Sequence, residues 1–134
     1  MSDLTSSYTT SNTTILVLIS DPVMRHVLRD ALDDAGYLVV TAGDLGAAVD
    51  RLHEMRPDLL ITAPYISSMT GQIAADYLRT KRHGLPIMIV AGYMEDDRVR
   101  DMNAIEDFHV FPANFARGDF LNEVHKILSV LQKP

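Results

Sequence analysis

The sequence predicts an open α/β fold, in which five parallel strands form one sheet and helices cover both of its faces. Five short apolar runs alternate with segments whose apolar residues recur at helical spacing, in units of about 20 to 25 residues. The first run, residues 14–19, is almost wholly apolar and rich in branched side chains, which is typical of a strand buried on both faces. Alternating strands and helices imply right-handed crossovers between parallel strands. A closed barrel would need eight such units, and 134 residues are too few for them.

The first unit starts with residues 14–19, the run that predicts the first strand. Asp21 can cap the helix that follows, Pro22 suits its first turn, and Gly36 is a natural end. Helical spacing places five apolar residues on the inner face of this helix: Val23, Val27, Leu28, Ala31 and Leu32.

The other units repeat this plan. Further strands are predicted at residues 37–41, 58–62, 85–90 and 108–111, and residues 63–71 are predicted to form a longer loop. Helices are predicted after the capping residue Asp44, around Ile73, Ala74, Tyr77 and Leu78 with an end at Gly84, and over residues 95–104. The last helix is predicted over residues 119–131, with Phe120, Leu121, Val124, Ile127, Leu128 and Leu131 as its inner stripe.

Composition limits the class of protein. Residues 1–13 are mostly Ser, Thr, Asn and Asp and are predicted to be a flexible leader, followed by a single domain over residues 14–132. The 12 basic and 18 acidic residues give a formal charge of −6, a surface that repels polyanions, so direct nucleic-acid binding is not expected. The chain has no cysteine, which excludes disulfides and cysteine-based zinc sites.

Neither a membrane span nor a secretory signal is predicted. No apolar run approaches the roughly 20 residues that cross a bilayer. The opening residues lack the basic and apolar blocks of a signal peptide. We therefore expect a cytoplasmic protein without membrane contact.

The carboxyl ends of the strands are the expected location of a functional site, because open α/β sheets bind ligands in the crevice beyond those ends. The segments that reach this crevice are residues 19–21, 63–71, 91–93 and 112–115.

Landmarks along residues 14–131 resemble the receiver domain of two-component response regulators, whose fold is flavodoxin-like with five strand–helix units in three layers. The landmarks are Ile15-Leu-Val-Leu18, Pro22, Arg25, Ala35-Gly36-Tyr37, Ala42, Pro57-Asp58-Leu-Leu-Ile61, Met69-Thr-Gly71, Leu85-Pro86-Ile-Met-Ile89 and Phe115. No single landmark is specific, and the resemblance depends on their order and spacing.

The resemblance implies that a phosphoryl group passes from a histidine kinase to an aspartate after the third strand. It also implies two carboxylates after the first strand that hold Mg²⁺, a Thr or Ser after the fourth strand, and a Lys after the fifth. On this chain these positions are occupied by Ile19 and Ser20 for the acidic pair, Ala63 for the acceptor, Ala91 for the Thr or Ser, and Ala113 for the Lys. Asp21 stands just beyond the pair. The resemblance thus indicates a degenerate receiver, or pseudo-receiver, whose phosphorylation pocket is vestigial.

The remaining polar residues of the sequence do not indicate another catalytic, metal-binding or nucleotide-binding site. Asp21 is interpreted as a helix cap, and Thr62, Ser67 and Ser68 lack an adjacent base that would make a hydroxyl nucleophilic. The five histidines show no metal-binding spacing, and the chain has no glycine-rich nucleotide motif, so neither a metal nor a cofactor is expected. The basic cluster Arg79, Lys81, Arg82 and His83 is interpreted as complementing a helix dipole rather than contacting nucleic acid.

The leading hypothesis is a non-enzymatic signalling module that acts by protein–protein contact, in or near a phosphorelay and independently of phosphorylation. Its expected partner is a histidine kinase, a phosphotransfer protein or an output protein, or a second copy of the chain. The resemblance implies which face binds it: the segment after Glu95, strand 108–111 and the helix after Asp119, with Phe108, Val110, Asn122, His125 and Lys126 as interface candidates. The alternatives are a flavodoxin-like domain that binds a small molecule in its neutral crevice, and a DNA-binding regulator, which the absence of an output domain disfavours.

Overall fold

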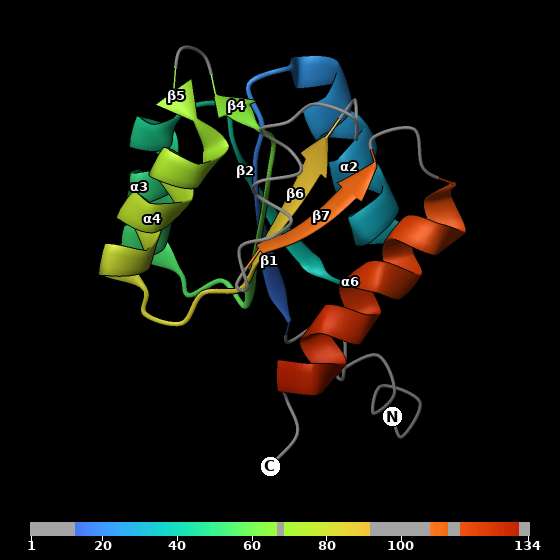
Figure 1. Cartoon of the computed structure of the whole chain (residues 1–134). Coiled ribbons are helices and arrows are strands. Elements are labelled where there is room, and N and C mark those ends of the chain that lie inside the picture. Colours follow the sequence, from blue (N-terminus) through green and yellow to red (C-terminus); the bar gives the residue numbers. More distant parts are fainter. Residues whose placement is uncertain (1–12, 67–68, 92–107, 113–115, 132–134) are drawn as a thin grey trace.

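Parallel strands form the centre of the molecule in the computed structural model, which describes residues 13–66, 69–91, 108–112 and 116–131 (Figure 1). The strands of this sheet are β1 (Thr14–Leu18), β2 (Leu38–Ala42), β3 (Leu59–Thr62), β6 (Ile87–Ala91) and β7 (Phe108–Pro112). Their order across the sheet is β2-β1-β3-β6-β7, and every neighbouring pair is parallel. The prediction of an open parallel sheet is therefore confirmed.

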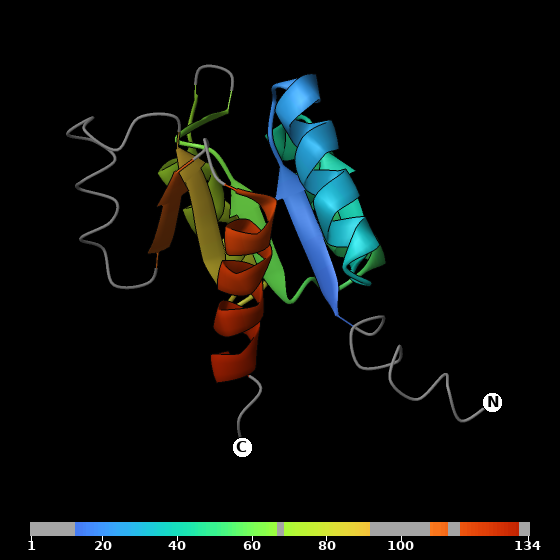
Figure 2. The ribbon, with the colours of Figure 1, turned by 90° about the vertical axis from the view of Figure 1, so that its right-hand side faces the viewer.

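Helices cover both faces of the sheet (Figures 1 and 2). The described helices are α2 (Pro22–Asp34), α3 (Leu45–Glu54), α4 (Gly71–Lys81) and α6 (Arg117–Leu131). Helices α2 and α6 share one core cluster with the sheet, and α3 and α4 share the other. The helix predicted over residues 95–104 lies outside the described residues. Within the described part of the chain, no helix is long and apolar enough to cross a membrane.

The alternation of side chains along β1 explains why this strand is apolar throughout. Ile15, Val17 and Ile19 pack in the α2/α6 cluster, whereas Leu16 and Leu18 pack in the α3/α4 cluster. All five side chains are at most 2% exposed. A strand covered on both faces has no solvent side on which polar residues would be favoured, so the uniform apolar run follows from its central place in the sheet.

Capping residues fix where the helices begin. Asp21 accepts a hydrogen bond from the Val23 amide at 3.2 Å, and Asp44 accepts one from the Ala47 amide at 2.8 Å. Both predicted caps are confirmed. The hydroxyl of Thr70, which was not predicted as a cap, does the same for α4.

Not all of the apolar residues that helical spacing indicated in two helices face the core. Val23 and Val27 of α2 are 70% and 48% exposed, and Ile73 and Tyr77 of α4 are 57% and 44% exposed. The residues that α2 buries are Leu28, Ala31 and Leu32, and those that α4 buries are Gly71, Ala74, Ala75 and Leu78. Three of the four residues that α4 buries are Gly or Ala, and Leu78 is the large apolar residue among them.

The connection between β3 and α4 also differs from the predicted loop. It contains two short antiparallel strands, β4 (Tyr65–Ile66) and β5 (Met69–Thr70). The last helix begins at Arg117, two residues before its predicted start.

Candidate functional site

Ile19 and Ala91 close two strands at the carboxyl edge of the sheet, and both are buried. Ile19 follows β1, is 2% exposed, and donates its amide hydrogen to the Ala42 carbonyl at 3.1 Å. Ala91 ends β6 and is fully buried. The side chain of Ile19 belongs to the α2/α6 core cluster, so this position is occupied by packed hydrocarbon. Ser20 and Asp21, the next two residues, are exposed.

Ala63, the residue at the acceptor position of the resemblance, follows β3 and is half-buried. The register pairs Leu18 with Thr62 and Thr62 with Ile89, so Ala63 lies at the same edge as Ile19 and Ala91. The structure thus brings Ile19, Ala63 and Ala91 together, with Ser20 directly after Ile19. Ala113 lies outside the described residues.

The hydroxyl of Thr62 points into the sheet. It donates a hydrogen bond to the Leu18 carbonyl at 2.7 Å, and the side chain is fully buried. This contact joins β3 to β1 and holds the hydroxyl away from solvent, which supports the interpretation of Thr62 as structural. Ser67 and Ser68, the other two hydroxyls weighed as acceptors, lie outside the described residues.

Gly71, the first residue of α4, lies against the backbone of Ala63 at the end of the β3–α4 connection. Its amide donates to the Pro64 carbonyl at 2.7 Å. A Cβ atom at this position would lie 3.1 Å from the carbonyl carbon of Ala63 and would overlap the carbonyl oxygen. The sequence indicated Gly71 only as a landmark, because nothing local reveals a contact with a backbone group eight residues earlier.

Arg25 is the charged side chain that the structure adds to this edge. Its Nη1 donates to the carbonyl of Ile19 at 2.7 Å and to that of Ser20 at 3.3 Å. A Cβ at Gly43 would lie 2.9 Å from the same nitrogen, so the guanidinium fills the space between the β1–α2 and β2–α3 connections. The sequence indicated Arg25 only as a landmark of the resemblance and did not predict these contacts. A positive charge in the first turn of α2, where the helix dipole disfavours it, could have indicated that the side chain has a specific partner.

The described residues do not fit a Mg²⁺ ion. Mg²⁺ in proteins is held by carboxylates and other hard oxygen ligands, and Ile19 and Ala63 offer no side-chain oxygen. The carboxylate of Asp21 is exposed and caps α2. Within the described ranges, no group of three or more His, Asp or Glu side chains is placed to bind a metal.

The outer side of α6 carries three of the predicted interface residues. Asn122, His125 and Lys126 are exposed, as their position off the apolar stripe predicts. Phe108 and Val110 lie in β7, and their side chains fall outside the description. Val124, Ile127 and Leu128 face the core.

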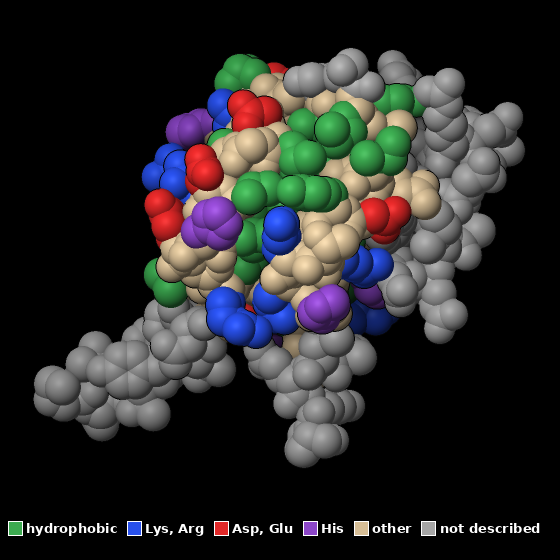
Figure 3. Space-filling view, turned by 90° about the vertical axis from the view of Figure 1, so that its left-hand side faces the viewer, with side chains coloured by type: hydrophobic (Ala, Val, Ile, Leu, Met, Phe, Trp, Pro, Cys, Tyr) green, Lys and Arg blue, Asp and Glu red, His purple; other side chains and the backbone are tan. Residues whose placement is uncertain are grey.

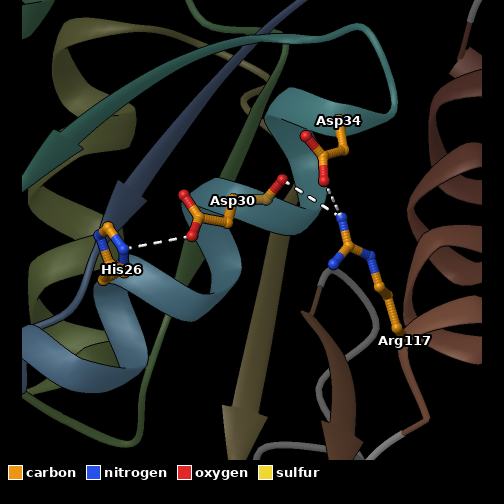
Figure 4. A network of polar contacts seen from close by, with 4 residues as sticks. All are labelled: His26, Asp30, Asp34 and Arg117. Carbon is orange, nitrogen blue, oxygen red and sulfur yellow. Dashed lines mark hydrogen bonds and ion pairs between the residues drawn. The ribbon is translucent and has the colours of Figure 1, made fainter.

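Polar contacts join α6 to α2 (Figure 4). Arg117 donates to the Asp34 carboxylate at 2.6 Å and to the Asp30 carbonyl at 3.4 Å. The carboxylate of Asp30 lies 3.2 Å from Nε2 of His26. These contacts occupy the exposed rim of the two helices, where ion pairs contribute little free energy but favour one orientation of α6.

Comparison with known proteins identifies the architecture. The family model described as the response regulator receiver domain matches residues 15–122. The chain belongs to this receiver family. Its residues therefore form a receiver domain of a two-component system.

Individual receivers show how much of the chain the likeness covers. The chain is 30% identical over 98 residues to the probable transcriptional regulatory protein TcrX of Mycobacterium tuberculosis, covering 72% of this chain and 42% of TcrX. It is 32% identical over 114 residues to the response regulator receiver protein CpdR of Brucella abortus, covering 85% of this chain and 95% of CpdR. The match thus spans less than half of TcrX and nearly all of CpdR.

A solved structure confirms the fold. The chemotaxis response regulator CheY4 of Vibrio cholerae superposes with a TM-score of 0.75 at 20% identity, covering 86% of this chain and 98% of that one. At this identity the likeness concerns the fold alone.

Proposed function

We propose that this receiver signals through protein–protein contacts and does not depend on aspartyl phosphorylation. The observation that carries the proposal is Ala63, which stands at the end of β3 where the resemblance places the phosphoryl acceptor. A methyl side chain has no nucleophilic atom and no charge. Its neighbours at this edge, Ile19 and Ala91, are apolar and buried.

Phosphoryl transfer requires a positioned nucleophile and cations that neutralise the oxygens of the transferred group. Arg25 is a cation at this edge, and its Nη1 donates to the carbonyls of Ile19 and Ser20. The Thr62 hydroxyl donates inward to Leu18. The pseudo-receiver interpretation therefore has support from each described position of the pocket.

We predict that the protein acquires no phosphoryl group from acetyl phosphate in the presence of Mg²⁺. Intact mass spectrometry of the whole chain checks this, with a receiver that keeps its acceptor aspartate treated in parallel as the positive control. A gain of one phosphoryl mass would contradict the proposal. Peptide mapping, with Ser67→Ala and Ser68→Ala as variants, would then locate the acceptor.

The proposed interaction surface is the outer side of α6. We expect Lys126→Glu to weaken self-association or capture of a signalling partner, because charges at the rim of an interface steer and orient encounter. Lys126 is exposed, so the same change is expected to alter the free energy of unfolding by no more than about 0.5 kcal/mol. Analytical ultracentrifugation and pull-down with a candidate histidine kinase or phosphotransfer protein measure the effect.

Arg29→Glu is the matched control for this surface. Arg29 is an exposed cation on α2, so the substitution makes the same charge change on a different helix. Association that is lost with Arg29→Glu and kept with Lys126→Glu would move the interface to α2 and would overturn the assignment to α6.

The alternative, a small molecule bound in the neutral crevice, has less support. Ile19 and Ala91 are buried, so their side chains offer a ligand almost no accessible surface. A thermal-shift screen with nucleotides and flavins remains its test.

A further inference from the structure

A cavity of about 300 Å³ lies where α3 and α4 end, at the opposite edge of the sheet from Ala63. Its lining comprises Leu52, Met55, Arg56, Lys81, Arg82 and His83. The cavity is at the small end of the range of pockets that hold ligands in proteins, roughly 300 to 1,000 Å³. The helices run antiparallel to the strands, so this end of the domain is separate from the crevice described above.

The charge of the lining is positive, although the chain as a whole carries −6. Three of the six lining residues are Lys or Arg, one is His, and none is acidic. Figure 3 shows the side of the domain covered by α3 and α4, and Lys, Arg and His side chains gather along its lower edge. Within the described ranges, neither Arg56 nor Lys81 forms an ion pair with a carboxylate.

Helix dipoles account for only part of this charge. The carboxyl end of a helix carries about half a negative charge, so α3 and α4 together contribute about −1. Three formal positive charges from Arg56, Lys81 and Arg82 exceed this and leave an excess of about +2 at the cavity. The sequence indicated that the basic residues complement helix dipoles. The positive charge that remains after the dipoles are offset can attract an anion.

One cation of the lining is held in place by the backbone. Nε of Arg82 donates to the Pro57 carbonyl at 3.2 Å, and Nη1 donates to the His83 carbonyl at 3.1 Å. The ammonium of Lys81 lies 5.4 Å from the centre of the Tyr77 ring, which orients it by a cation–π contact. Preorganised cations lose less entropy when they bind an anion than freely moving ones do.

The remaining wall is apolar. Leu52 and Met55 are half-buried and come from the last turn and the end of α3. A thioether beside a leucine side chain adapts to flat or irregular apolar groups. The lining thus suits a molecule with an anionic group at one end and an apolar group at the other.

We propose that this cavity binds a small phosphorylated molecule, with the phosphate on the cations and the apolar part against Leu52 and Met55. Nucleoside monophosphates represent this class, since they join a phosphate to a planar base. Arg and Lys are the side chains that bind phosphate oxygens most strongly. Such a site would give the domain an input that does not pass through Ala63, and it stands independently of the proposed function.

Isothermal titration calorimetry with the whole chain tests the proposal. The probes are adenosine and guanosine monophosphate, their nucleosides, and inorganic phosphate. We expect at least one monophosphate to bind ten-fold or more tightly than both its nucleoside and inorganic phosphate. Absence of monophosphate binding at millimolar concentration, or equal binding of nucleoside and monophosphate, would overturn the proposal.

Charge variants locate the site. Arg56→Glu is expected to weaken binding ten-fold or more, and Arg56 is exposed, so the variant should keep the melting temperature of the parent chain. Arg29→Glu is the matched control on α2, since Arg29 is an exposed arginine outside the lining, and we expect it to change affinity less than two-fold. Equal losses in the two variants would indicate non-specific attraction and overturn the proposal. Backbone amide shifts in NMR spectra should centre on Met55 and His83, and shifts centred on Ile19 would instead place the ligand in the crevice.

Discussion

Ile19→Asp is expected to lower the free energy of unfolding by about 3 kcal/mol at pH 7.5. Ile19 is 2% exposed and packs with residues of α2 and α6. The substitution removes a large apolar group and buries a carboxylate without a designated cation. The resemblance implies that Mg²⁺ and a lysine offset the carboxylates of ordinary receivers at this edge. Here Ala63 and Ala91 carry no charge, and Nη1 of Arg25 already donates to the carbonyls of Ile19 and Ser20. Chemical denaturation with urea measures the loss.

The pH dependence separates the charge from the loss of packing. Burial raises the pKa of an introduced carboxyl, so the folded state binds its proton more tightly than the unfolded state. The penalty is then full at pH 7.5 and decreases as pH falls through that raised pKa. Ile19→Asn is the control, because the asparagine side chain has nearly the same shape as aspartate and carries no titratable group. An aspartate variant as stable as the parent chain at pH 7.5 would mean that solvent reaches position 19.

The layer architecture was predictable because its signals are local. A central parallel strand is apolar at every position, and β1 from Ile15 to Leu18 shows this directly. Caps are equally local, since Asp21 and Asp44 act on amides two and three residues later. The short strands β4 and β5 were missed because two residues each are too few to show a periodic pattern.

Helix faces were less predictable. Spacing identifies apolar residues that lie near each other on a helix, but it does not identify the sector that meets the sheet. Val23 and Val27 fit the spacing of α2 and still face solvent. In α4 the sector against the sheet is lined by Ala74 and Ala75, which a search for large apolar residues passes over.

In the candidate site, the positions were predictable from the sequence, whereas the contacts between loops were not. The positions that the resemblance assigns to the pocket were predicted from order and spacing, and the register places Ala63 beside the ends of β1 and β6. The contacts of Arg25 with the Ile19 carbonyl and of Gly71 with Ala63 were not predictable, because both depend on how loops meet. The basic cavity likewise joins residues from the end of α3 with residues after α4.

Gly71→Ala is expected to destabilise the domain by about 3 kcal/mol, because the added methyl group meets backbone rather than a flexible side chain. The Cβ would overlap the carbonyl oxygen of Ala63, and relief requires the β3–α4 connection to move. That movement would also strain the 2.7 Å hydrogen bond from the Gly71 amide to Pro64. Urea denaturation of the variant gives the magnitude.

Gly46→Ala provides the matched control, since Gly46 also lies in the first turn of a helix. Its Cβ would lie 3.4 Å from a side-chain oxygen of Asp44, which is ordinary contact with a group that can move. Alanine also favours the helix over glycine by up to about 1 kcal/mol, so this variant should be as stable as the parent chain or more so. The two substitutions add the same methyl group in the first turn of a helix, at the first residue of α4 and the second residue of α3, and the difference between them reports the contact with Ala63. Equal stabilities of the two variants would contradict this prediction. They would show that the β3–α4 connection shifts to accommodate the added methyl group at little cost in free energy.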